Sequence, residues 1–303
     1  WPDLDTSVVS VYHGGAADAQ AVEPVVELSA TYQLHSRLYM LDRHHWPYLE
    51  AKNQAELLAY LGSASCAESY HSAEITWVIT GVDSNDYNGV LWARLSAVEA
   101  DHHVPALIRQ FRDRRLPALW HLDPASQPPD LAVRLSHLGC LRLPPGVCMA
   151  APLHTLTGEI PTHPRLTIER VTTLVDLADW IDVWTQGDEE SRTPREQLYA
   201  CLGLNGSQPL RHYLARLDGQ PVGVSQLFLG HHAAGLYCVA VLPPFRRCGI
   251  GSALTLTPLR DAQAAGYAIG VLGPSPEGQP MYRRLGFELF ASPFVGYALW
   301  LDP

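Results

Sequence analysis

The sequence predicts an α/β protein made of two similar units, each with a central sheet flanked by helices. Three observations carry this prediction. In residues 166–303, apolar strand-like runs alternate with stretches of helical periodicity. One of these runs leads into a turn rich in glycine and arginine and then into a helix. The order of elements in residues 89–153 echoes the order at the end of the chain, so the first half is predicted to be a degenerate copy.

Composition limits the class of protein. A chain of 303 residues is long enough for two domains, and 47% apolar with 17% charged residues is typical of a soluble globular protein. The net charge of −10 argues against a nucleic-acid partner. The sequence shows neither a membrane-spanning apolar run nor a signal peptide, so no membrane association is expected. The six cysteines form no C-x-x-C pair, which favours reduced thiols and a cytoplasmic location; the oligomeric state, a homodimer included, stays open.

The boundary between the units is predicted in a proline-rich stretch. Residues 151–164 carry three prolines and a glycine without helical periodicity, a composition typical of a linker. We therefore expect a first domain at 1–150, a linker at 151–165 and a second domain at 166–303.

The second unit shows clear signals for its elements. Thr193 and Pro194 are typical of a helix start, with Glu196 placed for a capping box. Asp218-Gly219 favours a hairpin turn. The run 236–241 is nearly all apolar and is expected to be buried on both faces. The predicted strands are 166–170, 211–217, 221–229, 236–241, 268–272, 287–290 and 295–301, and the predicted helices are 174–184, 193–202, 249–265 and 279–285.

The first unit is less regular. Its later elements follow the order of the second unit, and residues 135–141, LSHLGCL, resemble residues 282–288, YRRLGFE. Residues 148–153 are expected to close this unit as a strand. The predicted helices are 20–39, 46–61, 104–114 and 128–138, and the predicted strands are 75–80, 89–95, 117–122 and 148–153.

The turn at residues 246–251 has the chemistry of an anion site. The first turn of a helix carries unpaired N–H groups and partial positive charge from the helix dipole. Gly249 and Gly251 remove side chains that would keep a phosphate from the backbone. Arg246 and Arg247 add positive charge beside it. We therefore expect a phosphorylated ligand at this helix start.

The same residues carry a family resemblance. Arg246, Gly249 and Gly251 fit the pattern R/Q-x-x-G-x-G/A, between a strand that ends in proline and a helix, and Tyr282 begins a Y-x-x-x-G-F segment. Residues 166–303 thus resemble the GNAT superfamily of acetyl-CoA-dependent N-acetyltransferases, and the first half resembles a degenerate copy of that fold. The resemblance implies a mixed central sheet flanked by helices and acetyl-CoA as the acyl donor.

The resemblance also implies roles for residues. The pantetheine arm would pair with a splayed strand, the pyrophosphate with the turn, and Tyr282 would protonate the leaving thiolate as general acid. Ser275 stands where many relatives have asparagine, and it is the expected further contact to the donor. The implied donor-binding residues are Val239, Ala240 and Val241 on the strand, Arg246, Arg247, Cys248, Gly249, Ile250, Gly251 and Ser252 at the turn, and Ser275.

The acceptor side is less determined. Most aliphatic amines are protonated at neutral pH, so direct transfer needs a base. Glu189 and Glu190 are expected to supply it, with Tyr237 and His231 as alternatives. The expected function is acetylation of a small-molecule amine. A protein acetyltransferase acting on a lysine or an N-terminus, and a non-catalytic acyl-CoA sensor or interaction module, stay open, as does the length of the acyl chain.

Two further expectations concern sites. The histidines occur as adjacent pairs whose side chains diverge, without H-x-x-x-H spacing, so no metal is expected. Residues 96–115 of the first half, where a second pyrophosphate loop would belong, contain no glycine. One donor site per chain is therefore predicted.

Overall fold

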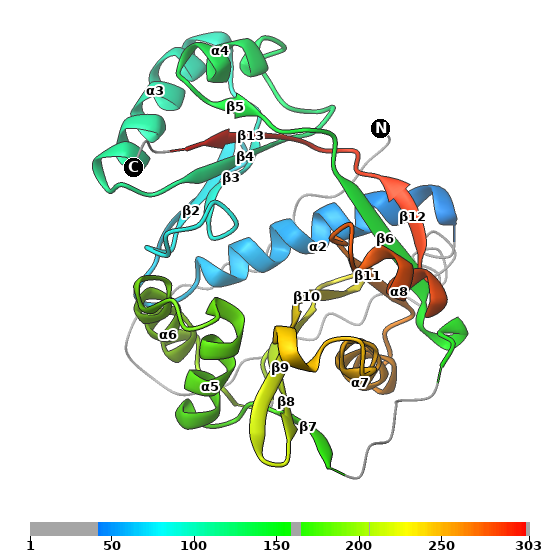
Figure 1. The fold of residues 1–303 in the computed structure, drawn as a ribbon. Helices are drawn as coiled ribbons and strands as arrows, with labels where there is room; N and C mark the ends of the chain where they lie inside the picture. Colours follow the sequence, from blue (N-terminus) through cyan, green and yellow to red (C-terminus); the bar gives the residue numbers. More distant parts are fainter. Residues whose placement is uncertain (1–41, 159–164, 206, 301–303) are drawn as a thin grey trace, which may run out of the picture.

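The computed structural model describes residues 42–158, 165–205 and 207–300, and the predicted helix 20–39 lies outside them. These residues form two sheets, and helix α2 runs between them (Figure 1). The α/β class and the tandem arrangement are confirmed. α2 starts at Trp46 with Pro47 in its first turn and ends at Leu61, so the predicted helix 46–61 is confirmed.

The first sheet has six strands in the order β1-β2-β3-β4-β13-β5. Helices α3 and α4 cover one of its faces (Figure 1). Strands β3 and β4 are parallel, and the other neighbouring strands are antiparallel. The elements before the second sheet are η1 (Arg43–His45), α2 (Trp46–Leu61), β1 (Glu68–His71), β2 (Ile75–Ile79), β3 (Asn88–Ala93), α3 (Ala97–Asp113), β4 (Ala118–Leu122), α4 (Leu131–His137) and β5 (Leu141–Arg142).

The second sheet has seven strands in the order β12-β6-β11-β10-β9-β8-β7. Here β10 and β11 are the parallel pair. The Asp218-Gly219 hairpin between β8 and β9 is confirmed, with both turn residues at positive φ. Its elements are β6 (Val147–Pro152), η2 (Leu153–Thr155), β7 (Leu166–Arg170), α5 (Leu174–Thr185), α6 (Glu189–Leu202), β8 (Leu210–Leu217), β9 (Gln220–Leu229), β10 (Ala234–Val241), η3 (Pro243–Phe245), α7 (Ile250–Ala264), β11 (Ile269–Leu272), α8 (Gln279–Arg284) and β12 (Glu288–Ala291), and β13 (Val295–Leu299) follows in the first sheet.

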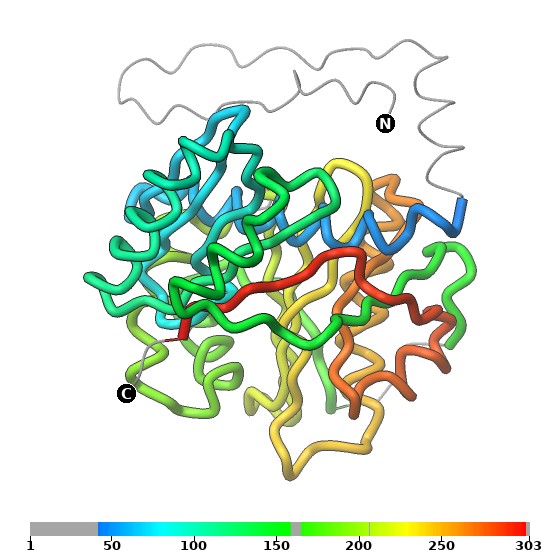
Figure 2. The backbone as a smooth tube through the Cα atoms, turned by 90° about the horizontal axis from the view of Figure 1, so that it is seen from above, coloured from blue at the N-terminus to red at the C-terminus, as the bar shows by residue number. Residues whose placement is uncertain are grey.

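The two sheets exchange one strand each. β6, expected to close the first unit, lies between β11 and β12 of the second sheet, and β13, expected to complete the second unit, lies between β4 and β5 of the first. Figure 2 shows the final strands passing from one sheet to the other. Ala151 and Pro152, predicted as linker, therefore belong to a strand. Cutting the chain at 150 and 166 does not separate two self-contained sheets, because side-chain alternation specifies a strand's faces and not its neighbours.

The two sheets have the same construction once the exchange is taken into account. The strands β1-β2-β3-β4-β13-β5 correspond in order and direction to β8-β9-β10-β11-β6-β12. Helices α3 and α4 accordingly correspond to α7 and α8. The internal echo in the sequence thus reflects a repeated fold.

Two helix starts differ from their predictions. α6 begins at Glu189, after Asp188, and Pro194 lies inside it rather than in its first turn. α3 begins at Ala97, well before the predicted residue 104, and Pro105 lies inside it. Pro194 was taken as evidence for a helix start, but α6 continues through it, as α3 does through Pro105, because packing outweighs the lost hydrogen bond.

The faces of the second sheet carry different helices. α7 and α8 pack on one face, where Leu236, Leu254 and Tyr282 share a core cluster. α2, α5 and α6 cover the other face, where α2 contributes Trp46 and Leu49 against β6 and β11. A group held between β10 and β11 would therefore have α7 and α8 on one side and α2 on the other.

Candidate functional site

Strands β10 and β11 separate soon after they meet. Their parallel pairing comprises Ala234 with Gly270 and Gly235 with Val271. Beyond Gly235, no strand of the described chain pairs with the β11-facing edge of β10. β10 also contains one extra residue between Tyr237 and Ala240, with Cys238 at φ 51°. This bulge is where the strand turns away.

The splay explains one departure from the sequence analysis. Residues 236–241 were expected to be buried on both faces, yet from Tyr237 to Val241 they are only half-buried. Backbone N–H and C=O groups along this edge are available to an extended ligand, as an added strand would use them. Val239, Ala240 and Val241, the predicted pantetheine-binding residues, lie along it.

Helix α7 begins beside the end of β10 without a side-chain cap. Its N-cap residue is Gly249 at φ 81°, a conformation that favours glycine. Arg247 also has positive φ, at 65°. Turn residues of this kind bring successive N–H groups to one concave side, an arrangement that binds anions. The first-turn N–H groups, including those of Ile250 and Ser252, are therefore free donors of a fifteen-residue helix.

The neighbouring side chains refine this picture. The Nε of Arg246 donates a hydrogen bond of 2.9 Å to the carbonyl oxygen of Val241, which ties the turn to the end of β10. Cys248 is exposed, and its thiol contacts the carbonyl oxygen of Arg246. A Cβ atom at Gly251 would lie 3.2 Å from the sulfur of Met281 on α8. Gly251 therefore also serves the close approach of α7 and α8.

Tyr282 lies on α8 against α7. Its side chain is buried and meets the ring of Phe287 edge to face, with the centroids 6.0 Å apart. Burial raises the pKa of Tyr282 to about 12, and a hydrogen bond with the side chain of Thr255 on α7 offsets part of this effect. The hydroxyl therefore keeps its proton at neutral pH, which a general acid requires.

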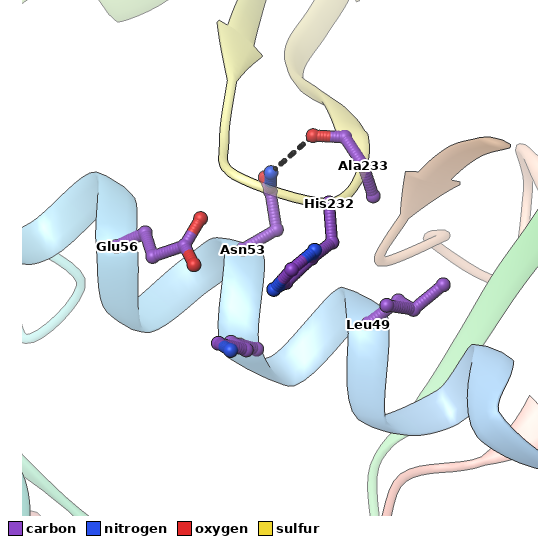
Figure 3. Close-up of a pocket in the computed structure, with 6 residues that line it drawn as sticks. Leu49, Asn53, Glu56, His232 and Ala233 are labelled. Carbon is purple, nitrogen blue, oxygen red and sulfur yellow. Dashed lines mark hydrogen bonds between the residues drawn. The ribbon is translucent and has the colours of Figure 1, made fainter. Parts of the chain in front are cut away.

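Helix α2, from the first half of the chain, packs against the opposite face of the splay. The Tyr237 hydroxyl donates a 2.7 Å hydrogen bond to the side-chain oxygen of Asn53, whose nitrogen donates one of 2.8 Å to the carbonyl oxygen of Ala233. Figure 3 shows Asn53 pointing from α2 to the turn between β9 and β10. A Cβ atom at Gly235 would lie 1.9 Å from Asn53, so only glycine allows this contact.

Figure 3 shows a small pocket between α2 and the β9–β10 turn. Leu49, Lys52, Asn53, Glu56, His232 and Ala233 line it, and it leaves no room for a water molecule. It marks the seam between α2 and the β9–β10 turn. The polar groups around it hold the two halves of the protein together.

Sequence reasoning missed Glu50. This residue of α2 is only 7% exposed, and its Oε1 lies 3.7 Å from the position of a Cβ atom at Gly273, the residue that follows β11. No described residue forms a hydrogen bond or ion pair with its carboxylate. Burial raises the pKa of Glu50 to about 7. The missed signal is a carboxylate on the apolar face of a predicted helix.

The other predicted residues lie elsewhere. Glu189 and Glu190 are exposed in the first turn of α6, where Glu189 is 3.8 Å from Arg192. His231 is exposed at the β9–β10 turn and forms an ion pair with Glu56 that raises its pKa. The Ser275 hydroxyl accepts a hydrogen bond from the N–H of Gly278, so it stabilises the turn before α8. A Cβ atom at Gly278 would lie 3.3 Å from the Ser275 hydroxyl and 3.0 Å from the ring of Tyr282, so Ser275 stands close to the predicted acid.

The counterpart of the anion site in the first half is closed. Ser96 caps α3 by accepting a hydrogen bond from the N–H of Glu99, and the Glu99 carboxylate accepts one of 2.8 Å from the N–H of Ser96. This capping box uses the helix-start donors within the chain. It also places a negative charge where a phosphate would bind.

An uncapped helix start beside a splayed parallel strand pair defines an α/β domain suited to an extended, phosphorylated ligand. Residues 174–287 match the model of the acetyltransferase (GNAT) family. These residues are therefore a GNAT-family domain, as the resemblance of the 246–251 turn indicates.

Solved structures show that the likeness in fold extends over most of the chain. A GCN5-related N-acetyltransferase from Kribbella flavida is 17% identical, with a TM-score of 0.59 over 82% of this chain and 94% of its own. A tandem GNAT protein from the clavulanic acid biosynthesis pathway is 14% identical, with a TM-score of 0.51 over 86% and 97%. A conserved protein of unknown function from Staphylococcus epidermidis ATCC 12228 is 14% identical, with a TM-score of 0.53 over 76% and 91%. No curated protein sequence matches the chain.

Two further observations describe the molecule. Within residues 42–158, 165–205 and 207–300, no three His, Cys, Asp or Glu side chains gather as a metal ion would require. No helix in the described part of the chain has the length and apolar character needed to cross a membrane.

Proposed function

We propose that the chain transfers the acetyl group of acetyl-CoA to an amine of a small molecule. The observation that carries this proposal is the uncapped start of α7 beside the unpaired edge of β10. The pyrophosphate of the donor suits the N–H groups of residues 247–252, and its pantetheine arm suits the edge at residues 239–241. The fold likeness to N-acetyltransferases and the family of residues 174–287 support the same donor.

The residues around the splay have complementary roles in the proposed transfer. The amine nitrogen attacks the thioester carbon, and a backbone N–H group of β10 polarises the carbonyl oxygen. As the carbon–sulfur bond breaks, the Tyr282 hydroxyl donates a hydrogen bond or its proton to the sulfur. The pKa of Tyr282, about 12, lies further above the pKa of a thiol than the pKa of a free tyrosine does. A hydrogen bond to the sulfur therefore contributes alongside proton transfer.

The position of α2 favours a small acceptor over a protein. This helix packs across β6, β10 and β11 on the face opposite α7 and joins the β9–β10 turn through Asn53. A protein chain would need an open groove along that face. The first half of the chain therefore supports a covered acceptor site, into which a small amine fits better than a lysine or N-terminus of a protein.

The test has two parts. Titration with CoA should show one site per chain, and a second site of similar affinity would contradict the closed counterpart at α3. A panel of amino acids, polyamines, amine antibiotics and peptides is then incubated with acetyl-CoA. Because Cys66, Cys201 and Cys248 are exposed, acetylated products are followed by mass rather than with a thiol reagent. Transfer only to peptides would favour the protein acetyltransferase, and CoA binding without any transfer would favour the non-catalytic sensor.

A further inference from the structure

The first half of the chain places a carboxylate at the splay of the second sheet. Glu50 lies on α2, while the strands that it approaches belong to the other half, and its Oε1 is near Gly273 at the end of β11. Alternation along β11 confirms the face: Ile269 and Val271 pack with α2, and Leu272 packs with α7. Gly273 follows Leu272 and thus falls on the α2 side.

The surroundings of Glu50 are unusual for a structural carboxylate. It is 7% exposed, and no described residue satisfies it with a hydrogen bond or an ion pair. A buried carboxylate without a partner in the protein costs stability. An ordinary side chain at residue 273 would come within contact distance of it, and the glycine keeps that space open.

We propose that Glu50 is the base that removes a proton from the acceptor ammonium, so that the first half of the chain contributes a catalytic residue to the site of the second. This inference rests on the proposed function. The Glu50 carboxylate takes the proton of one N–H bond, and the freed electron pair of nitrogen forms the bond to the thioester carbon. The carbonyl re-forms as the carbon–sulfur bond breaks, and the sulfur leaves with the electrons of that bond toward the Tyr282 hydroxyl on the opposite face of the sheet, which stabilises or protonates it. The second proton of the attacking nitrogen passes to solvent water, which restores the proton of Tyr282, and the neutral amide is released.

The two faces give the acid and the base separate positions. Glu50 lies with α2 on one side of the sheet, and Tyr282 lies between α7 and α8 on the other. An acyl group held in the splay between β10 and β11 would face both. An ammonium arriving on the α2 side would meet a carboxylate, whereas the sulfur would lie toward the tyrosine.

The other titratable groups near Glu50 do not compete for this role. Cys148 of β6 and Tyr237 of β10 face it, and its negative charge raises the pKa of both in addition to their burial. The Tyr237 hydroxyl already donates to Asn53. Further along α2, Glu56 is engaged by His231, with Lys52 nearby. A pKa of about 7 for Glu50 lets the carboxylate accept a proton and release it again near neutral pH.

Two small amines of different basicity test the proposal on the full-length protein. Methylamine is protonated at pH 7.5 and needs a base, whereas hydroxylamine is already neutral at that pH. Transfer of acetyl to each is measured by mass with acetyl-CoA, after subtraction of the reaction without enzyme. The variants are Glu50→Gln and, as a matched control on the same helix, Glu56→Gln.

We expect Glu50→Gln to lower methylamine turnover by about 100-fold, the scale of a lost general base, and hydroxylamine turnover by less than about threefold. Glu56→Gln should leave both rates near those of the unmodified protein, and CoA affinity should not change in either variant. Equal losses for the two amines, or no loss for methylamine, would overturn the role of Glu50 while leaving the acetyltransferase intact. If the unmodified protein transfers acetyl neither to these two amines nor to any amine of the panel, the proposed function fails, and the assignment of Glu50 fails with it.

Discussion

The two helices that follow the central parallel strands, α3 and α7, start in opposite ways. α3 begins at a capping box in which Ser96 and Glu99 use each other's N–H groups. α7 begins at Gly249 without a side-chain cap. The two sheets have the same strand order and direction, so the difference lies in a few local residues. The proposed anion site of the second half therefore differs from its counterpart in the first half by the absence of a side-chain cap.

The gap between the two central parallel strands is also filled in the first sheet and open in the described residues of the second. In the first sheet β3 and β4 pair only at Gly89–Leu119 and Val90–Trp120 before they separate. The gap is then filled by Gln127, whose N–H donates to Ala93 and whose carbonyl accepts from Leu95. In the second sheet, no described strand occupies the corresponding edge of β10. The first half therefore has its own groups bonded both to the start of α3 and to the edge of β3, whereas the start of α7 and the edge of β10 are unpaired in the described chain.

The position of the acid completes the comparison. Leu135 on α4 stands where the second half has Tyr282 on α8, and both are buried. Leucine fills the space without a hydroxyl. The first sheet and its helices α3 and α4 thus have the packing of the fold without the uncapped helix start, the open strand edge and the tyrosine of the second half.

The largest expected effect on turnover comes from removing the hydroxyl of Tyr282 on α8, since α4 has no hydroxyl at the corresponding Leu135. Tyr282→Phe keeps the ring packing and removes the hydroxyl, and we expect kcat to fall by about 10²–10⁴-fold, the usual contribution of a positioned acid. CoA affinity should stay within about twofold, because the proposed phosphate site is at the start of α7 and not at Tyr282. Tyr267→Phe, a change of the same kind away from α8, is the control. Unchanged turnover of Tyr282→Phe would remove the acid assignment.

Copying the carboxylate of α3 onto α7 should close the anion site. Ser252 occupies the helix position that Glu99 holds in α3, so Ser252→Glu brings a negative charge to the first turn. CoA affinity measured by calorimetry should fall roughly 100-fold, since repulsion between two charges at contact costs about 1–4 kcal/mol near a protein surface. Ser252→Gln has the same size without the charge and should bind CoA far better. Equal binding by the two variants would show that the phosphates lie elsewhere.

The buried carboxylate of α2 predicts a pH-dependent stability. The pKa of Glu50 is raised from 4.5 to about 7 in the folded protein, so the native state binds more protons than the unfolded one between these values. Stability from this group is present below about pH 4.5 and is lost as the pH rises through about 7. Glu50→Gln should therefore gain about 2 kcal/mol over the unmodified protein at pH 8 relative to pH 5. Urea unfolding at both pH values measures this, and an equal difference at the two would rule out a raised pKa.

The smallest expected effect tests whether the cap of α3 has a purely structural role. Ser96→Ala removes one side of the capping box and should lower the free energy of unfolding by about 1 kcal/mol. It should not create a second CoA site, because Gln127 still fills the splay. Thermal unfolding and CoA titration of the same variant check both statements. A second CoA site in this variant would mean that the cap alone separates the two halves.

Much of the fold could be predicted from local patterns. Helix α2 begins and ends at its predicted residues, and the β8–β9 hairpin follows from Asp218-Gly219. The predicted start of α6 was wrong because Pro194 lies inside the helix, and α3 starts seven residues before its predicted start. β1 and β5 were not predicted: all residues of both are exposed, so they lack the apolar alternation that indicates a strand.

The candidate site was likewise predicted only in part. The turn at 246–251 was readable because an anion site at a helix start depends on neighbouring residues and on the conformations that glycine allows. The proposed base, Glu50, could not be predicted from the sequence, because a catalytic carboxylate is defined by what it faces. Glu189 and Glu190 have the right chemistry and are exposed, whereas Glu50 is separated by the whole first unit from the strands that it meets.

The sequence by itself determined the repeated strand–helix order, the uncapped turn at Gly249 and the absence of such a turn in the first half. Each depends on residues close together in the chain, whose backbone preferences are local. Only the tertiary structure decided that β6 and β13 exchange sheets and that α2 brings Glu50 to the splay. Those outcomes depend on which apolar faces pack together. The local sequence pattern predicts that a face is apolar, but it does not predict which distant face will cover it.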